Sequence, residues 1–301
     1  MQQLCGWHDR PADVAAVAAA QPFPNFVTGA QAYGSAGVGK GKRTLLYLAL
    51  YKAVGGKANW HSRLQTIGDC VSMGSAGAVD ILRALEFVIN QSEYIAETAT
   101  EPIYAISRID IGKGALGNSD GSVGAWAAEA VKKFGTLVRQ AYGNIDLTKY
   151  DGQRAKQWGS AGCPASLKPP AHDHLVQTTS LVTTWAELCD AIAAGYPVTV
   201  ASNQGFTNTR DKDGFAHPSG TWPHQMVVIA ADDASGRPGG LVQNSWGDDW
   251  ITGPTQYDQP PGSFWVDAEV LERNMLSAQD AWAYSNLQGY PVKKFNLGDI
   301  F

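Results

Sequence analysis

The sequence predicts an α+β fold, in which a helical first half packs on an antiparallel sheet formed by the second half. Two observations support this prediction. Apolar residues recur at helical spacing in several segments before residue 195, and after Pro197 short β-rich runs alternate with turns rich in Gly, Pro and Asp. The 301 residues, 44% of them apolar and 17% charged, suffice for one large domain or for two halves that share a cleft.

Four segments have the apolar spacing and the end signals of helices. The first ends at Gly55-Gly56, and the second begins after Asp69, an expected N-cap that places Cys70 in the first helical turn. The third lies between Ser122 and Gly135, and the fourth follows the capping-box pattern Thr184-x-x-Glu187 and stops at Gly195. The predicted helices are 45–54, 70 to about 90, 123–134 and 184–195.

Four later segments have the composition of short strands. They are rich in Val, Ile and aromatic residues, and turn-forming stretches such as 232–240 separate them. The predicted strands are 197–202, 225–231, 241–246 and 263–267.

Composition excludes several classes of function. The net charge of −5 and the scattered Lys and Arg residues predict no nucleic-acid partner. The cysteines Cys5, Cys70, Cys163 and Cys189 form no Cys-x-x-Cys pair, so neither a metal site nor any other cofactor is predicted. No apolar run suits a membrane span or a secretory signal, and we expect a cytoplasmic or particle-associated protein that does not interact with membranes.

Cys70 is a candidate nucleophile because of its place at the start of a helix. The thiolate is the reactive form of cysteine, and a helix N-terminus near a cationic imidazole lowers the thiol pKa. A cysteine in an apolar helix is also a common small core residue, so Cys70 alone leaves both interpretations open.

His224 and Asn244 are candidate partners for this thiol. His224 begins an apolar strand, and the strand that follows ends in Asn244-Ser245-Trp246-Gly247. Adjacent antiparallel strands could bring the two side chains together. We expect the Asn244 amide to accept the proton of His224 Nδ1, which would leave Nε2 facing the sulfur.

These motifs together resemble the papain-like cysteine peptidases, in a divergent form of bacterial or phage type. The resemblance depends on Gln65-Thr-Ile-Gly-Asp-Cys70 before a helix of small residues, a His before an apolar strand, and the tetrapeptide Asn-Ser-Trp-Gly. His224 and Asn244 follow Cys70 by 154 and 174 residues, compared with roughly 130–150 in the family. The likeness covers about residues 60–270.

The resemblance implies a papain-like fold, with the active site in the cleft between the two halves, and a role for each motif. Cys70 would attack a peptide or amide carbonyl, His224 would act as general base and acid, and a thioester would form and hydrolyse. Gln65 and the Cys70 N–H would form the oxyanion hole, and Trp246 would cover the histidine–asparagine contact. The remaining implied substrate-binding residues, which would hold an extended polypeptide or peptide-like substrate by its main chain, are Gly121, Ser122 and Gly124.

Three positions depart from the family pattern. Gln65 lies five residues before Cys70, one fewer than usual, and Val71 stands where the family generally has tryptophan. The carboxylate of Asp69 would oppose ionisation of the neighbouring thiol unless its side chain turns away to cap the helix.

Other motifs leave alternatives open. Gly34-Ser-Ala-Gly-Val-Gly-Lys40 matches part of a phosphate-binding loop, but Gly41 replaces the Ser or Thr that would hold magnesium. His172 and His174 could ligate a metal, although a solvated loop is the simpler interpretation. His217 lies close enough to His224 in the sequence to be confused with the general base.

The expected organisation has three parts: an N-terminal extension or removable pro-segment (1–60), a helical subdomain with the nucleophile (61–180) and an antiparallel β subdomain with the histidine and asparagine (181–301). The predicted function is that of a cysteine peptidase. Two alternatives remain: a papain-like structural or binding protein of a larger assembly with little activity, and a cell-wall peptide amidase.

Overall fold

The computed structural model describes residues 4–89 and 97–295. Among these residues, seven strands form one antiparallel sheet in the order β4-β9-β5-β6-β7-β8, and β1 pairs with the far end of β6. The strands are β1 Arg43–Leu45, β4 Thr178–Leu181, β5 Val198–Phe206, β6 Pro218–Asp232, β7 Gly239–Gln243, β8 Ser263–Asp267 and β9 Asp280–Ser285, with a separate hairpin of β2 Ala141–Tyr142 and β3 Ile145–Asp146.

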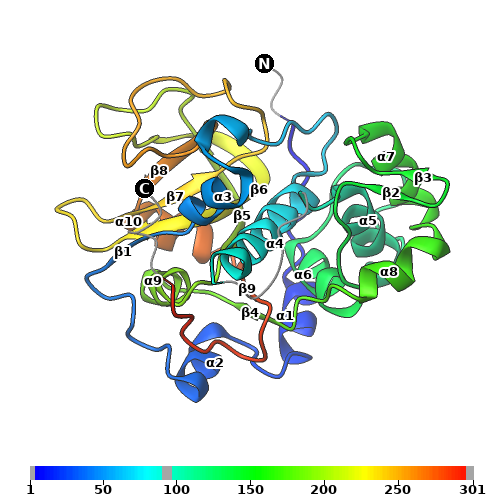
Figure 1. Ribbon diagram of the computed structural model, residues 1–301, viewed down its shortest axis with the longest axis horizontal. Helices are drawn as coiled ribbons and strands as arrows, with labels where there is room; N and C mark the ends of the chain where they lie inside the picture. Colours follow the sequence, from blue (N-terminus) through cyan, green and yellow to red (C-terminus); the bar gives the residue numbers. More distant parts are fainter. Residues whose placement is uncertain (1–3, 90–96, 296–301) are drawn as a thin grey trace.

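Helices cover the sheet and also form the half of the molecule beside it (Figure 1). The α-helices are α1 Pro11–Ala19, α2 Phe26–Tyr33, α3 Tyr47–Val54, α4 Cys70–Val88, α5 Thr100–Ala105, α6 Gly124–Lys133, α7 Gly152–Ala161, α8 Lys168–His172, α9 Trp185–Ala193 and α10 Ala268–Val270. Short 3₁₀ turns occur at η1 Lys57–Asn59 and η3 Ala165–Leu167, and π turns at η2 Ile106–Ile111 and η4 Leu271–Leu276. No helix of residues 4–89 and 97–295 is long and apolar enough to cross a membrane.

The long helix α4 runs through the middle of the molecule, between the sheet and the helical half (Figure 1). Its small residues allow β6 to come close: a Cβ atom at Gly74 would lie 3.2 Å from the Gln225 side chain, and one at Gly77 would lie 3.1 Å from Val227. Larger side chains at these positions would force the sheet away, so this face of α4 fixes the distance between the two halves. The predicted α+β arrangement is confirmed.

Several predicted boundaries are also confirmed. α3 ends where Gly55 adopts a left-handed conformation with φ of 78°, and α9 begins with the capping box of Thr184 and Glu187. β8 has the predicted bounds, while β5, β6 and β7 differ from the prediction mainly at their ends. The predicted end of the second helix, near residue 90, lies outside the described residues.

Two predicted caps are wrong, and several elements were not predicted, among them α1, α2, α5, α7, α8, β1, β4 and β9. The Asp69 side chain makes no cap hydrogen bond to α4, and Ser122 does not cap α6, whose N-cap is Val123. β9 was not predicted, because its sequence Asp280-Ala-Trp-Ala-Tyr-Ser follows a polar helical segment and alternates without a clear turn signal.

Part of the first sixty residues is built into the fold. β1 pairs with β6, and α3 packs on α4. α1 likewise packs on α6, and the proposed three-part division of the chain remains a prediction.

Candidate active site

Cys70 lies in the first turn of α4, fully buried against β6. Two hydrogen bonds from the Gln225 side-chain amide join this turn to the strand, 2.9 Å to the Val71 carbonyl and 3.2 Å to Ser75 Oγ. The backbone N–H groups of Gln225 and Gly6 face the thiol. The sulfur is therefore held beside the strand position that follows His224.

His224 and Asn244 are brought together by neighbouring strands. His224 lies on β6, Asn244 directly follows β7, and His224 Nε2 is 2.8 Å from Asn244 Oδ1. This corrects the predicted orientation of the ring, because Nε2 and not Nδ1 lies against the amide oxygen. The reason is reach: Nε2 lies at the far end of the ring and extends across to the neighbouring strand. Nδ1 is buried, with no hydrogen-bond partner among the described residues.

Tryptophan rings cover this pair. The ring centroids of Trp246 and His224 are 4.8 Å apart, and Trp222 packs on Trp246 at the same distance. His224 is 1% exposed and Asn244 2% exposed. Water is excluded from the histidine–asparagine hydrogen bond, which strengthens it.

The start of the described chain, residues 4–8, lies across these residues; we call it the N-terminal strap. The Leu4 carbonyl oxygen accepts hydrogen bonds from Gln65 Nε2 at 3.2 Å and from Trp246 Nε1 at 3.1 Å. The Gly6 and Trp7 amides both donate to the carbonyl of Pro223, the residue before His224, at 3.0 Å. Because the Gly6 N–H also faces the Cys70 thiol, the strap covers Cys70.

The strap also pairs with the loop before α6. Ser122 donates its N–H to the Gly6 carbonyl at 2.8 Å and accepts from the His8 N–H at 2.9 Å, a parallel bridge centred on Trp7. Gly121 adopts φ of 104°, and a side chain there would collide with Gly6 and His8. The loop predicted to hold a substrate main chain thus holds the main chain of the protein's own N-terminal strap.

Trp7 fixes the middle of the strap. Its indole is 4% exposed, and Nε1 donates to Asp280 Oδ2 at 2.6 Å. The same oxygen accepts from the Gly124 N–H at 2.9 Å, and Trp282 Nε1 donates to Oδ1 at 2.8 Å. Burial raises the pKa of Asp280 to about 6 despite these donors, so the carboxyl is ionised above that pH.

Burial also controls the charges of the candidate catalytic groups. It raises the pKa of the Cys70 thiol well above its usual range, only partly opposed by the backbone N–H groups of Gln225 and Gly6. It lowers the pKa of His224 to about 4, against the opposing effect of the Asn244 hydrogen bond. With the strap in place, the two groups are an uncharged thiol and an uncharged imidazole at neutral pH.

Gln65 is close to the site but its amide is occupied. Besides Leu4, its Nε2 donates to the Ile67 carbonyl at 2.8 Å, and its Oε1 accepts from Ser245 Oγ at 2.6 Å. The Gln65 N–H groups therefore bind carbonyl oxygens already, and one of these belongs to the strap.

Sequence reasoning missed three contributors to this site: the strap, Asp280 and Tyr150. Asp280 lies on the unpredicted strand β9, and the Tyr150 hydroxyl donates to Asp69 Oδ2 at 3.0 Å. None of them belongs to a motif, and only the fold brings them to the start of α4.

The alternative motifs are placed elsewhere. In the glycine-rich loop, the Gly37 and Gly39 amides bond to the Asp190 carboxylate at 2.7 and 2.8 Å, so an internal anion already occupies them. His217 Nε2 lies 3.3 Å from Asp211 and is exposed, and it is not the histidine beside Asn244. His172 and His174 are exposed near the end of α8, and within the described residues no three His, Cys, Asp or Glu side chains are grouped to hold a metal ion.

Comparison with solved structures identifies the architecture. The chain superimposes on xylellain, a cysteine protease from Xylella fastidiosa, with a TM-score of 0.57 and 15% identity, covering 95% of this chain and 98% of that one. The fold is papain-like. Digestive procathepsin L 3 of Tenebrio molitor (TM-score 0.48, 18% identity, 72% and 63% covered) and a procathepsin B of Trypanosoma congolense (0.49, 10%, 83% and 77%) are weaker matches. No family model and no curated protein matches the sequence.

Proposed function

We propose that the protein is a cysteine peptidase in which Cys70 is the nucleophile, His224 the general base and acid, and Asn244 the residue that orients the imidazole. The observation that carries this proposal is the 2.8 Å His224–Asn244 hydrogen bond, next to the strand position Gln225 whose backbone N–H faces the Cys70 thiol in the first turn of α4, in a papain-like fold. A polypeptide or peptide-like chain is the proposed substrate.

The proposed chemistry uses the two ring nitrogens of His224 differently. Nε2 is held by Asn244, so Nδ1 is the nitrogen available to take the Cys70 proton. The thiolate then attacks the carbonyl carbon, and His224 returns the proton to the leaving amine as the thioester forms. Water, deprotonated by His224, hydrolyses the thioester and releases the thiol.

The stabilisation of the oxyanion would come from N–H groups that the strap now engages. Gln65 Nε2 and Trp246 Nε1 both bind the Leu4 carbonyl oxygen, an acceptor of the kind that a substrate would present. We propose that substrate binding requires the strap to leave, and that the described conformation is a closed form. Residues 4–8 would then be the displaceable part of the predicted N-terminal extension.

A protein of the same fold with little activity is the second candidate. Full burial of Cys70 and the uncharged state of the thiol and imidazole favour it. The two candidates differ in whether release of the strap produces a reactive thiol.

Hydrolysis of unfolded polypeptide tests the first candidate. Fluorescently quenched denatured casein is incubated with the wild type, with Cys70→Ser and with Cys163→Ser, which removes a buried thiol outside the site. We expect turnover in the wild type and in Cys163→Ser and none in Cys70→Ser. No turnover in any of them, combined with release of products from cell-wall stem peptides, would favour the amidase alternative.

A further inference from the structure

Asp69, the residue before Cys70, carries a carboxyl group with few hydrogen-bond donors. It is fully buried, makes no cap bond to α4, and accepts a hydrogen bond from the Tyr150 hydroxyl at 3.0 Å. Its other oxygen, Oδ1, has no partner in the part of the chain that the structure describes. An ionised carboxylate has room for about four donors, and burying one with so few is strongly unfavourable.

The surroundings of Asp69 add to this cost. The carboxyl groups of Glu101 on α5 and Asp120 in the loop before α6 both act on it as like charges. The cations nearby are engaged with these two acids and not with Asp69: Arg139 and Arg154 pair with Glu101, and Lys156 with Asp120. Burial and these charges raise the pKa of Asp69 to about 8, although the Tyr150 hydrogen bond opposes the shift.

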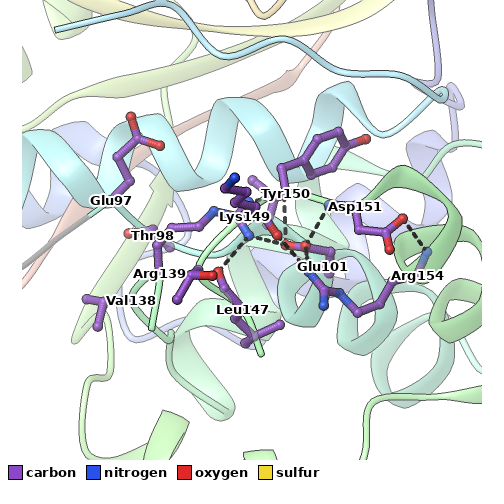
Figure 2. Close-up of polar contacts among 12 residues, drawn as sticks. Glu97, Thr98, Glu101, Val138, Arg139, Leu147, Lys149, Tyr150, Asp151 and Arg154 are labelled. Carbon is purple, nitrogen blue, oxygen red and sulfur yellow. Dashed lines mark hydrogen bonds and ion pairs between the residues drawn. The ribbon is translucent and has the colours of Figure 1, made fainter. Parts of the chain in front are cut away.

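Tyr150 is held in place by a buried ionic network. Glu101 Oε2 accepts from Arg139 Nη1 at 2.7 Å, and Oε1 accepts from Arg154 Nη2 at 2.9 Å and from the Asp151 N–H at 3.1 Å (Figure 2). Arg139 also lies over the Tyr150 ring, 5.8 Å from its centroid. The network therefore anchors the segment around Tyr150, whose hydroxyl reaches the start of α4.

We propose that Asp69 and Tyr150 are a positioning pair for Cys70, a proposal that rests on the proposed thiol chemistry. Tyr150 fixes a neutral Asp69 carboxyl against the first turn of α4. When Asp69 loses its proton, the negative charge beside the sulfur suppresses formation of the thiolate. Asp69 is then a positioning residue that sets the alkaline limit of Cys70 reactivity. It contacts no substrate.

The expected effect follows from the interaction of like charges. A neighbouring carboxylate disfavours the thiolate by on the order of one pKa unit, or about tenfold in thiolate population. Asparagine has the shape of a neutral aspartic acid and cannot ionise. Replacing Tyr150 by phenylalanine removes the donor that favours the ionised carboxylate, so Asp69 stays neutral to higher pH.

The experiment measures the alkylation rate of Cys70 by iodoacetamide between pH 6 and 9.5 on the full chain, with site assignment by peptide mapping. Asp69→Asn, Tyr150→Phe and the control Asp173→Asn, which removes an exposed carboxylate at the C-terminal end of α8, are compared with the wild type. Cys163, buried outside the site, is the internal reference thiol in every sample.

We compare the ratio of the Cys70 alkylation rate in Asp69→Asn to the rate in wild type. This ratio should be about tenfold or more higher at pH 9 than at pH 6. In Tyr150→Phe we expect a slower reaction but an alkaline limit displaced to higher pH, a shift that a purely structural role would not produce. Superimposable pH profiles of wild type and Asp69→Asn overturn the positioning role. A Cys70 that reacts no faster than Cys163 in every protein is a different result, which overturns the proposed thiol chemistry as well.

Discussion

Replacing Trp7 by phenylalanine should open the N-terminal strap and expose Cys70. The substitution keeps most of the buried ring but removes the indole N–H that donates to Asp280 at 2.6 Å. Asp280 retains the Gly124 and Trp282 donors, so the carboxyl is not left unpaired. The closed form therefore loses mainly the Trp7 hydrogen bond.

The size of the effect follows from that bond. At pH 7.5 Asp280 is ionised, because its pKa is about 6, and a hydrogen bond to a charged group contributes about 1.5–3 kcal/mol. Each 1.4 kcal/mol changes an equilibrium tenfold, so the open fraction of the strap should increase by about 10- to 100-fold. If labelling occurs through the open form, the rate of Cys70 modification increases by the same factor.

The assay is intact-mass labelling of Cys70 by an epoxide thiol reagent at pH 7.5. Trp185→Phe is the matched control, because Trp185 Nε1 also donates to an aspartate, Asp233, at 2.9 Å, but lies at the start of α9. The thermal midpoint of each variant shows whether global unfolding contributes. An unchanged Cys70 rate in Trp7→Phe, or an equal increase in Trp185→Phe, would refute the role of the strap.

Three further predictions concern the site and its support. Asn244→Ala should slow acylation of Cys70 by at least about tenfold in pre-steady-state assays while Cys163 labelling stays constant, because the imidazole loses the acceptor that orients it. Glu101→Gln should lower the unfolding free energy by about 3–5 kcal/mol in urea titrations, since it removes the fully buried charge that pairs with the partly buried Arg139 and Arg154. Glu269→Gln, in an exposed helical pair, should change it by less than about 0.5 kcal/mol. Because burial lowers the pKa of His224 to about 4, the unfolded chain binds a proton between about pH 6.5 and 4 that the folded chain does not, so stability falls as the pH falls through this range. Between pH 7 and 4, the unfolding free energy of His224→Gln should fall by about 3 kcal/mol less than that of the wild type. Equal decreases in the two proteins would contradict the effect of burial on the His224 pKa.

The elements with strong local signals were predictable. Glycine at the end of α3 and the capping box of α9 act within one or two turns, so one segment of sequence is enough to recognise them. The apolar spacing after Cys70 likewise predicted α4, and the Asn-Ser-Trp-Gly motif led to the papain-like fold.

The errors lie where tertiary contacts override local preference. Asp69 has the sequence position of an N-cap, but Tyr150, 81 residues later, takes its carboxyl instead. The orientation of the His224 ring depends on where β7 ends relative to β6, which no local signal encodes. Residues 4–8 cover Cys70 through individual hydrogen bonds to residues that lie far apart in the sequence. No periodicity or motif therefore indicates this contact.

The measurement that tests the central claim most directly is site-resolved epoxide labelling of Cys70 in three proteins: wild type, Trp7→Phe, and Trp7→Phe combined with His224→Ala. An activated thiol under a removable strap predicts slow labelling in the wild type, labelling about tenfold or more faster in Trp7→Phe, and loss of that gain in the double variant. If opening the strap leaves Cys70 no more reactive than Cys163, or if the gain persists without His224, the proposed catalytic pair is contradicted.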